Sequence, residues 1–330
     1  MMKKTFKTIS SPWGQRVALL VIICIIMAFL ERRFFSLNNA KSILLAISVN
    51  GIMACGMLYT VLTGGMDLSV GSMAGISASI AFVINQSFGF STGGFIYGCA
   101  IALVLCLVSG FVNGFFVTYF GLPAFVVTLA TKYVLYGCIY MVTRGFFIIP
   151  PPASLASRFG NANVLMIPMP VIVFVIVAVV SAFVLIKTTY GRKLYAIGGN
   201  KNVANLAGVK SNLNIQISYM VSSVLAGLGG VLLAAMNGQA GQTTALNYEG
   251  NVLMAMIVGG INLAGGEGGV PGAIFGALLV GIINNAMLML SISSDIQKFV
   301  QGVVILAAMT LSMYATRSSA GTLGTKVKKA

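Results

Sequence analysis

Few residues in this 330-residue sequence could carry out acid–base or metal chemistry. It has five acidic residues, no histidine and five cysteines, and the cysteines lie inside apolar runs without the CxxC spacing of metal sites. Histidine-based metal and acid–base chemistry is therefore excluded. We expect no catalytic residue, no metal site and no enzyme activity, and we interpret the cysteines as small packing residues of helices.

Asp67 is the acidic residue with the most informative surroundings. It lies in TGGMDLSVGS, after Gly64 and Gly65 and before Ser69 and Gly71. Because an unpaired carboxylate beside a membrane helix is costly, Asp67 marks a structural or functional polar site. We favour a cap, in which an oxygen of Asp67 or Ser69 accepts backbone N–H groups of the next helix. A direct role in passing a solute or in coupling to motion is the alternative.

A second glycine-rich segment, VGGINLAGG at 258–266, matches TGGMDLSVG at 63–71 in its glycines and in the Asp or Asn between them. The match predicts a break between helices in each half of a duplicated bundle, and chance similarity of glycine-rich segments is the alternative. The residues of the second segment in question are Gly259, Gly260, Asn262 and Gly266. The GxxxxGK[ST] pattern of a phosphate-binding loop is absent, so we expect no ATPase in this chain.

Four amide side chains stand inside apolar runs, and they are Asn50, Asn113, Asn284 and Asn285. Hydrogen bonding between helices is the usual use of such amides in membrane proteins. Lining a polar path for a hydroxylated solute is the alternative, and all four are therefore candidate pore-lining residues.

The elements that position these residues are predicted to be membrane helices. The chain is 58% hydrophobic and 8% charged, whereas roughly a quarter of the residues of soluble proteins are charged. About 20 apolar residues let a helix cross ~30 Å of hydrocarbon, and barrel strands would instead alternate over about 10 residues. We therefore predict an all-α, polytopic transmembrane bundle that forms one domain over 1–330.

Ten helices are predicted, which places both termini on one side of the membrane. Basic residues gather in the tails 1–16 and 315–330 and in the loop 187–211, which the positive-inside rule assigns to the cytoplasm. The net charge of +15 is thereby explained without nucleic-acid binding. The predicted helices are 17–30, 42–63, 69–86, 95–119, 124–143, 168–186, 212–236, 250–264, 270–290 and 297–314.

The opposite face is expected to carry the loops with Glu31, Glu249 and Asp295. It would also carry the proline-rich segment 144–167, as a lateral helix or flap or as a plain connection. Basic residues that do not fit this orientation are Arg32, Arg33 and Lys41. They leave one extra or missing helix in the first half as an alternative.

The cytoplasmic loop has the pattern of a short capped helix. Asn200 is a good N-cap, and Gly208 is well placed just after the C-terminus. Val203, Ala204 and Ala207 share one small apolar face. Such a helix fits a groove of another protein, whereas a merely solvated basic loop would not need its caps.

The segment YGRKLYAIGGNKNVANLAGVK resembles the cytoplasmic loop of permease subunits of bacterial sugar-type ATP-binding-cassette (ABC) importers, the ribose, xylose and arabinose branch. The residues that carry this resemblance are Gly191, Arg192, Gly198, Asn200, Ala204 and Gly208, with Thr188, Ala196 and Val209. GGMDLSVGS, NGFFVTYFGLPAFVVTLAT and VGGINLAGGEGGVPGAIFGALLVGIINNAMLML extend it over nearly the whole chain.

The resemblance implies a multi-pass protein of the bacterial inner membrane that imports a monosaccharide or sugar-like solute. Its implied partners are a second permease subunit, identical or different, a pair of ATP-binding subunits that hold ATP and Mg, and an external solute-binding protein. The helix around Asn200–Gly208 would be the coupling helix seated in the ATPase. Import of nucleosides or branched-chain amino acids by a related permease is the first alternative, and an ion-coupled carrier is the second.

Overall fold

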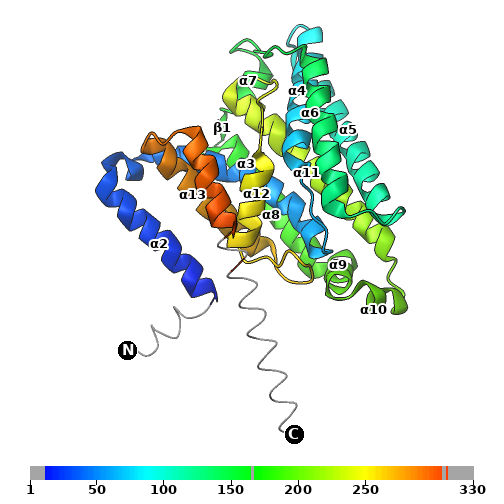
Figure 1. The fold of residues 1–330 in the computed structure, drawn as a ribbon. Helices are drawn as coiled ribbons and strands as arrows, with labels where there is room; N and C mark the ends of the chain where they lie inside the picture. The colour runs from blue at the N-terminus through cyan, green and yellow to red at the C-terminus, as the bar shows by residue number, and fades with distance from the viewer. Residues whose placement is uncertain (1–11, 165–166, 307–309, 311–330) are drawn as a thin grey trace, which may run out of the picture.

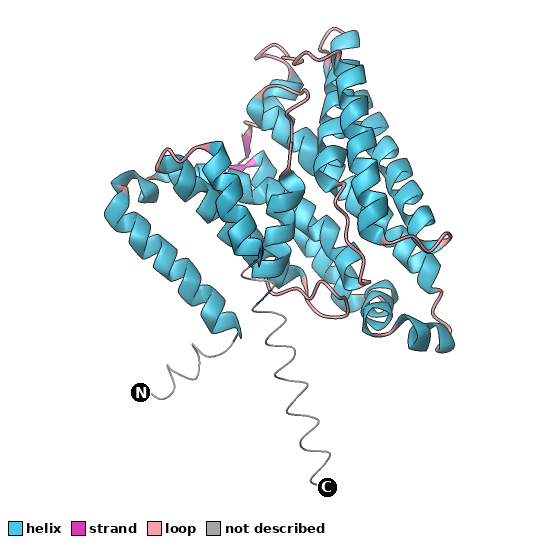
Figure 2. Cartoon of the chain, in the orientation of Figure 1, coloured by secondary structure: helices cyan, strands magenta, loops and turns pink. Residues whose placement is uncertain are grey.

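The computed structural model describes residues 12–164, 167–306 and 310, and this part of the chain is almost entirely helical (Figures 1 and 2). Within the described residues, six helices are long and apolar enough to cross a membrane. They are α3 (Leu37–Leu62), α5 (Thr92–Thr118), α6 (Ala124–Thr143), α8 (Met169–Lys187), α11 (Ser211–Asn237) and α13 (Val270–Met289). The predicted all-α membrane class is thereby confirmed.

The other elements are shorter or less apolar. The longer ones are α2 (Pro12–Leu30), α4 (Val70–Ser87), α12 (Tyr248–Val258) and the helix 294–306. The short ones are η1 (Arg32–Phe35), α7 (Leu155–Phe159), α9 (Thr189–Gly199) and α10 (Lys201–Leu206). The strands β1 (Asn163–Val164) and β2 (Ile167–Pro168) form an antiparallel hairpin in which Val164 pairs with Ile167.

Each of the ten predicted ranges contains a helix, but one predicted end is wrong. The helix predicted over 250–264 ends at Val258. Gly260 ends it with a positive φ of 71°, a backbone conformation that glycine adopts at little cost and that stops a helix. The predicted end at 314 and most of both tails lie outside the described residues.

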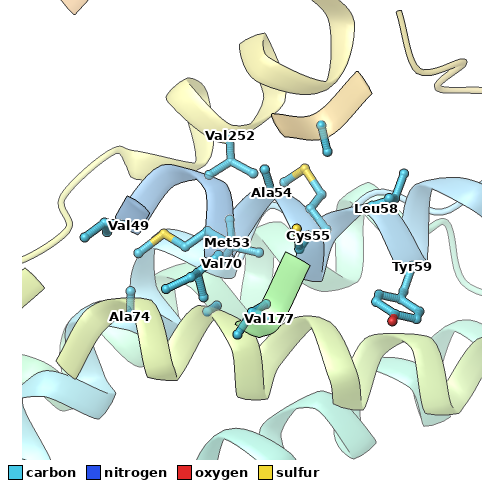
Figure 3. Close-up of a cluster of buried hydrophobic side chains, with 14 of the residues drawn as sticks. Val49, Met53, Ala54, Cys55, Leu58, Tyr59, Val70, Ala74, Val177 and Val252 are labelled. Carbon is cyan, nitrogen blue, oxygen red and sulfur yellow. The ribbon is translucent and has the colours of Figure 1, made fainter. Parts of the chain in front are cut away.

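The core is built around α3 and α11, which pack against each other and together contact α4, α5, α8 and α13. The part of α3 from Ile47 to Leu62 is buried on every side, and most of its side chains are apolar or small, as expected of such a helix. Figure 3 shows Met53, Cys55 and Leu58 of α3 among side chains that include Val177 of α8 and Val252 of α12. The outer faces of α5, α6 and α8 carry exposed apolar side chains, which suits contact with lipid.

The two ends of the bundle differ in what caps them. Helix α7 and the β1–β2 hairpin lie at one end, and α9 and α10 lie at the other (Figure 1). The proline-rich segment therefore holds a short helix, in agreement with one of its two predicted forms. Its backbone is tied to the chain after α11, since the Ile148 N–H donates to the Ala240 carbonyl at 2.8 Å and the Ala240 N–H donates to the Ile148 carbonyl at 3.1 Å.

Candidate functional site

Three glycine-rich segments that are far apart in the sequence meet beside α9. The Gly266 N–H donates a hydrogen bond of 3.0 Å to the Leu62 carbonyl at the end of α3. A Cβ on Gly198, in the last turn of α9, would collide with that carbonyl and with the Gly266 nitrogen. Gly265 packs in the same way against the backbone of Gly64 and Gly198. The end of α9 and the two predicted break points are thus in backbone contact, with no room for a side chain between them.

The two break points share two features of local structure. Each preceding helix ends on a glycine with positive φ, Gly64 at 80° and Gly260 at 71°. In each loop an Asx turn follows, in which Asp67 Oδ1 accepts from the Ser69 N–H and Asn262 Oδ1 accepts from the Ala264 N–H, both at 3.0 Å. The sequence match therefore corresponds to a shared Asx turn at the equivalent residues Asp67 and Asn262. The positive-φ glycines are offset by one position, because Gly64 is equivalent to Gly259 and not to Gly260.

Asp67 is fully buried and joins four parts of the bundle. Its Oδ1 accepts from the Ser69 N–H and hydroxyl, and its Oδ2 accepts from the Ser222 hydroxyl of α11 at 2.7 Å. The Ser69 hydroxyl oxygen in turn accepts from the Asn113 amide of α5 at 3.1 Å. Thr131 of α6 donates to the Asn113 carbonyl oxygen at 2.6 Å. The carboxylate therefore has the donors that a buried charge needs.

The predicted cap at Asp67 is confirmed only in part. Asp67 accepts a backbone N–H just ahead of α4, but Ser69 makes no side-chain cap to that helix. The Ser69 hydroxyl is used for the network instead, and Asp67 reaches across to α11. Ser222 is the twelfth of the 27 residues of α11, so Asp67 lies near the middle of that helix.

The basic loop contains two short helices, of which the sequence pattern predicted one. Thr188 caps α9 by accepting from the Gly191 N–H at 3.3 Å. Helix α9 was missed because its glycines are poor helix formers. The sequence pattern that could have indicated α9 is the helical spacing of Tyr190, Leu194 and Ile197 at i, i+4 and i+7. In the structure Leu194 and Ile197 are buried, as such a face predicts. Arg192 and Lys193 lie on the exposed side.

Tyr195 connects α9 to the second break point. Its hydroxyl donates to the Gly268 carbonyl at 2.9 Å. Burial raises the pKa of the Tyr195 hydroxyl above its usual value, so the group stays protonated and keeps this bond over the physiological pH range.

The caps predicted for α10 are confirmed. Asn200 Oδ1 accepts from the Asn202 and Val203 N–H groups at 3.0 and 3.1 Å. After the helix, Gly208 has a φ of 83° and the Val209 N–H donates to the Ala204 carbonyl at 3.0 Å. This is the Schellman arrangement, in which a left-handed glycine lets the chain satisfy the last carbonyls.

The predicted outward face of α10 is wrong in one residue. Ala204 is 4% exposed and packs in a cluster with Ile197 and Ile215, so it faces the protein's own core. The exposed apolar side chains are Val203 at 60% and Leu206 at 89%, and Ala207 is exposed beside them. The inward face of α10 is occupied by Ala204, so the larger apolar side chains of Val203 and Leu206 are left exposed to solvent.

The four candidate amides do not form one site. Asn113 belongs to the Asp67 network. Asn285 and Asn39 of α3 exchange two amide hydrogen bonds of 2.8 and 3.0 Å. Asn284 instead donates to Asn251 of α12 at 3.1 Å. Asn50 is buried, and its Oδ1 has no hydrogen-bond partner among the described residues.

One charged pair was not foreseen. Glu249, predicted in an outer loop, is buried in the first turn of α12 and pairs with Lys132 of α6 at 2.6 Å. The loop prediction for Glu249 is therefore wrong. The available signal was Lys132 itself, because a lysine within an apolar run needs a counter-charge.

Comparison with known proteins shows the family to which the chain belongs. The family described as branched-chain amino acid transport system / permease component matches residues 39–309. The ribose import permease protein of Escherichia coli (strain K12) is 36% identical over 296 residues, which are 89% of this chain and 91% of that protein. No solved structure matches the chain.

Two further permeases of the same strain are similar over comparable lengths. The L-arabinose transport system permease protein is 32% identical over 311 residues, 93% of this chain and 92% of that protein. The D-allose transport system permease protein is 29% identical over 304 residues, 91% of this chain and 90% of that protein.

The Asp67 network predicts a difference between two adjacent serines of α11. Ser222→Ala removes a hydrogen bond to a buried carboxylate and should lower the free energy of unfolding by about 1.5–3 kcal/mol. Ser223→Ala is the matched control, because the Ser223 hydroxyl is equally buried but has no partner among the described residues. Reversible denaturation in detergent measures both, and equal stability of the two variants would contradict the network's role.

Proposed function

Because the chain belongs to the family of permease components of the branched-chain amino acid transport system, we propose that it is the membrane subunit of an ABC importer for a monosaccharide or sugar-like solute. The observation that carries the proposal is the 36% identity to a ribose import permease over 89% of the chain. The relatives named for L-arabinose and D-allose support the same solute class. Import of branched-chain amino acids, which the family description names, is the second candidate.

The partners follow from this type of transporter. The sequence lacks a phosphate-binding loop, so a separate pair of ATP-binding subunits would hold ATP and Mg. An external binding protein would deliver the solute, and a second permease subunit, the same chain or another, would complete the path. The chain would lie in the bacterial inner membrane.

The proposed topology has ten spans, with α9 and α10 in the cytoplasm. The end of the bundle that carries them holds five basic residues from Lys187 to Lys210, which supports this orientation. The tails 1–16 and 315–330 would then be cytoplasmic, and α7 with the β1–β2 hairpin would face outward. The whole chain would act as one transmembrane domain with a coupling loop at 187–211.

The coupling helix is proposed to be α10, with Val203 and Leu206 as its docking residues. These side chains are apolar and exposed, and buried apolar anchors supply most of the energy of a protein interface. Asn200 and Gly208 fix the ends of α10, so the helix would respond as a unit when the ATPase pair closes. The movement would pass through Gly198 to both break points, because all three backbones are in contact.

The Asx turn that the two break points share at equivalent residues supports the proposed internal repeat. In each half a helix ends at a positive-φ glycine and an Asx turn redirects the chain. Gly71 and Gly266 would be the corresponding glycines after these turns. Breaks of this kind within transporter repeats lie beside the solute path in other transporters.

Of the four amides, Asn284 is the one we retain as a pore-lining residue. It is only partly buried, whereas Asn50, Asn113 and Asn285 are buried. Its partner Asn251 also accepts from Gln301 at 3.0 Å. A group of three amides can exchange its internal hydrogen bonds for bonds to a passing hydroxylated solute.

Reconstitution tests the function, with two neighbouring glycines as probes. Vesicles are prepared with the permease in the membrane, its ATPase pair on the inner side and the binding protein outside. They should accumulate D-ribose, L-arabinose or D-allose only when ATP is present inside the vesicles. Gly198→Ala should abolish most of this uptake, because the new Cβ separates three backbone segments. Gly199→Ala is the control, since a Cβ there meets no other atom within 4 Å.

Uptake by the permease alone, driven by an ion gradient, would favour the carrier alternative. Accumulation of leucine but of none of the three sugars would favour the second candidate. Equal uptake by the Gly198→Ala and Gly199→Ala variants would contradict the transmission path while leaving the importer assignment intact.

The docking residues give a separate prediction. Leu206→Glu should reduce recovery of the ATPase pair with the purified permease about tenfold or more, since loss of a buried anchor commonly costs 2 kcal/mol or more. Asn205→Glu places the same charge on the neighbouring exposed face of α10 and should have a small effect. Co-purification and ATP-dependent uptake measure both variants. If the two behave alike, α10 does not dock through this face.

A further inference from the structure

The ion pair between Lys132 and Glu249 lies deep in the bundle. Glu249 is beside Gly71 of α4, where a Cβ would collide with its Oε2. Gly71 lies between Asp67, which bonds to Ser222 of α11, and the part of α4 that contacts Gly230 of α11. Glu249 is therefore level with the middle of α11, far from either end of the bundle.

The shape of α12 explains how an acidic residue comes to this depth. The helix has 11 residues, or about 16 Å at 1.5 Å per residue, which is about half of the ~30 Å hydrocarbon layer. The irregular segment 238–247 covers the remaining distance, with Thr244 and Ala245 buried against α4. Glu249 thus lies in the first turn of a half-length helix that begins inside the bundle and ends at the second break point.

Packing alone does not account for this pair. Burying two charges costs several kcal/mol, and their attraction often fails to repay it when apolar side chains could fill the same space. The neighbouring side chains Tyr133, Leu246 and Asn247 are exposed. A lysine and a carboxylate at this depth are unfavourable beside lipid, so the face that presents them must border water or protein.

The groups around the pair suit a hydroxylated ligand. Glu249 is 8% exposed, and its Oε2 has no hydrogen-bond donor among the described residues. Tyr136 accepts from the Asn247 N–H at 3.1 Å, which leaves its own hydroxyl hydrogen free to donate. The rings of Tyr133 and Tyr136 flank the Lys132 ammonium at 5.9 and 5.8 Å. A few fixed polar groups among aromatic rings are the usual make-up of a small-molecule site.

We infer that Glu249, oriented by Lys132, is a specificity-determining solute contact of the importer, at which Oε2 accepts a hydrogen bond from one sugar hydroxyl during passage. The inference rests on the importer function proposed above and deepens it. Oε2 is enclosed against Gly71 in the present conformation, so a shift of α12 must admit the solute. Helix α12 leads directly into the loop whose Gly265 and Gly266 contact Gly198. A movement of the coupling loop 187–211 can therefore reach α12 through this contact.

The test compares a neutral double variant with a matched control in the complete importer. Lys132→Met with Glu249→Met removes both charges and the acceptor oxygens of Glu249 together, and it leaves no unpaired buried charge. The control is Lys298→Met with Asp295→Asn, which neutralises an exposed pair separated by 3.6 Å. Initial uptake rates are measured for whichever of D-ribose, L-arabinose and D-allose the wild type imports, and for the monodeoxy analogues of that sugar.

The result expected is a selective loss. Uptake of the parent sugar by the Lys132/Glu249 variant should fall about tenfold or more, as for a lost hydrogen bond to a charged group. Uptake of the analogue that lacks the contacted hydroxyl should change little, and the amount of permease in the membrane should be unchanged. The binding protein is the same in every assay, so its own preference cancels in the ratio of variant to wild type.

Two outcomes overturn the inference while the importer function stands. Equal loss for the parent sugar and all analogues assigns the pair a purely structural or gating role, and no loss for any sugar removes it from the path. A wild type that imports none of the three sugars overturns the proposed function and the inference together.

Discussion

The structure depends on a contact in which no side chain takes part. The Leu62 carbonyl, the Gly198 Cα and the Gly266 N–H meet where α3, α9 and the loop before α13 come together. Close-packed backbone cannot absorb displacement by changing rotamers, so a movement of any one segment is transmitted to the other two or breaks the contact. In the proposed importer this joins the surface that receives the ATPase to both break points of the bundle.

Above this contact, two carboxylates occupy successive levels along the start of α4. Asp67 bonds directly to Ser69 and to Ser222 of α11, and Ser69 extends the network to Asn113 of α5 and Thr131 of α6. Glu249 lies beyond Gly71, where its only charged partner is Lys132 and one oxygen is unpartnered among the described residues. The fully bonded carboxylate suits a fixed joint, and the incompletely bonded one suits a group that exchanges partners. The difference between the two acids therefore lies in their hydrogen-bond donors.

Much of the fold was predictable because membrane helices need long apolar runs, and these are visible in the sequence. The family predicted from four motifs is confirmed, and the caps at Asn200 and Gly208 are confirmed because cap chemistry is local. The errors are equally local in cause. Helix α9 was missed because glycines that serve backbone contact resemble helix-breaking residues. Ala204 was predicted on the outward face because a six-residue helix has too few turns for the sequence pattern to show which face is buried.

The misplacement of Glu249 has a different reason. A half-length helix preceded by an irregular segment looks, in one dimension, like an outer loop followed by a full span. Only the packing of Gly71 and Lys132 against the carboxylate shows that the loop descends into the bundle. The meeting of the three glycine segments was not predictable either, because nothing in each motif alone indicates which other backbone it touches.

Hydrogen–deuterium exchange at the Gly266 amide tests the central claim most directly. The measurement uses the complete importer, once without nucleotide and once with ATP trapped by a hydrolysis-deficient ATPase pair. If the three segments move as one unit, the Gly266 amide keeps its bond to the Leu62 carbonyl and is equally protected in both states. Loss of that protection in the ATP-bound state would show that the contact opens during the cycle, which contradicts its role in transmission.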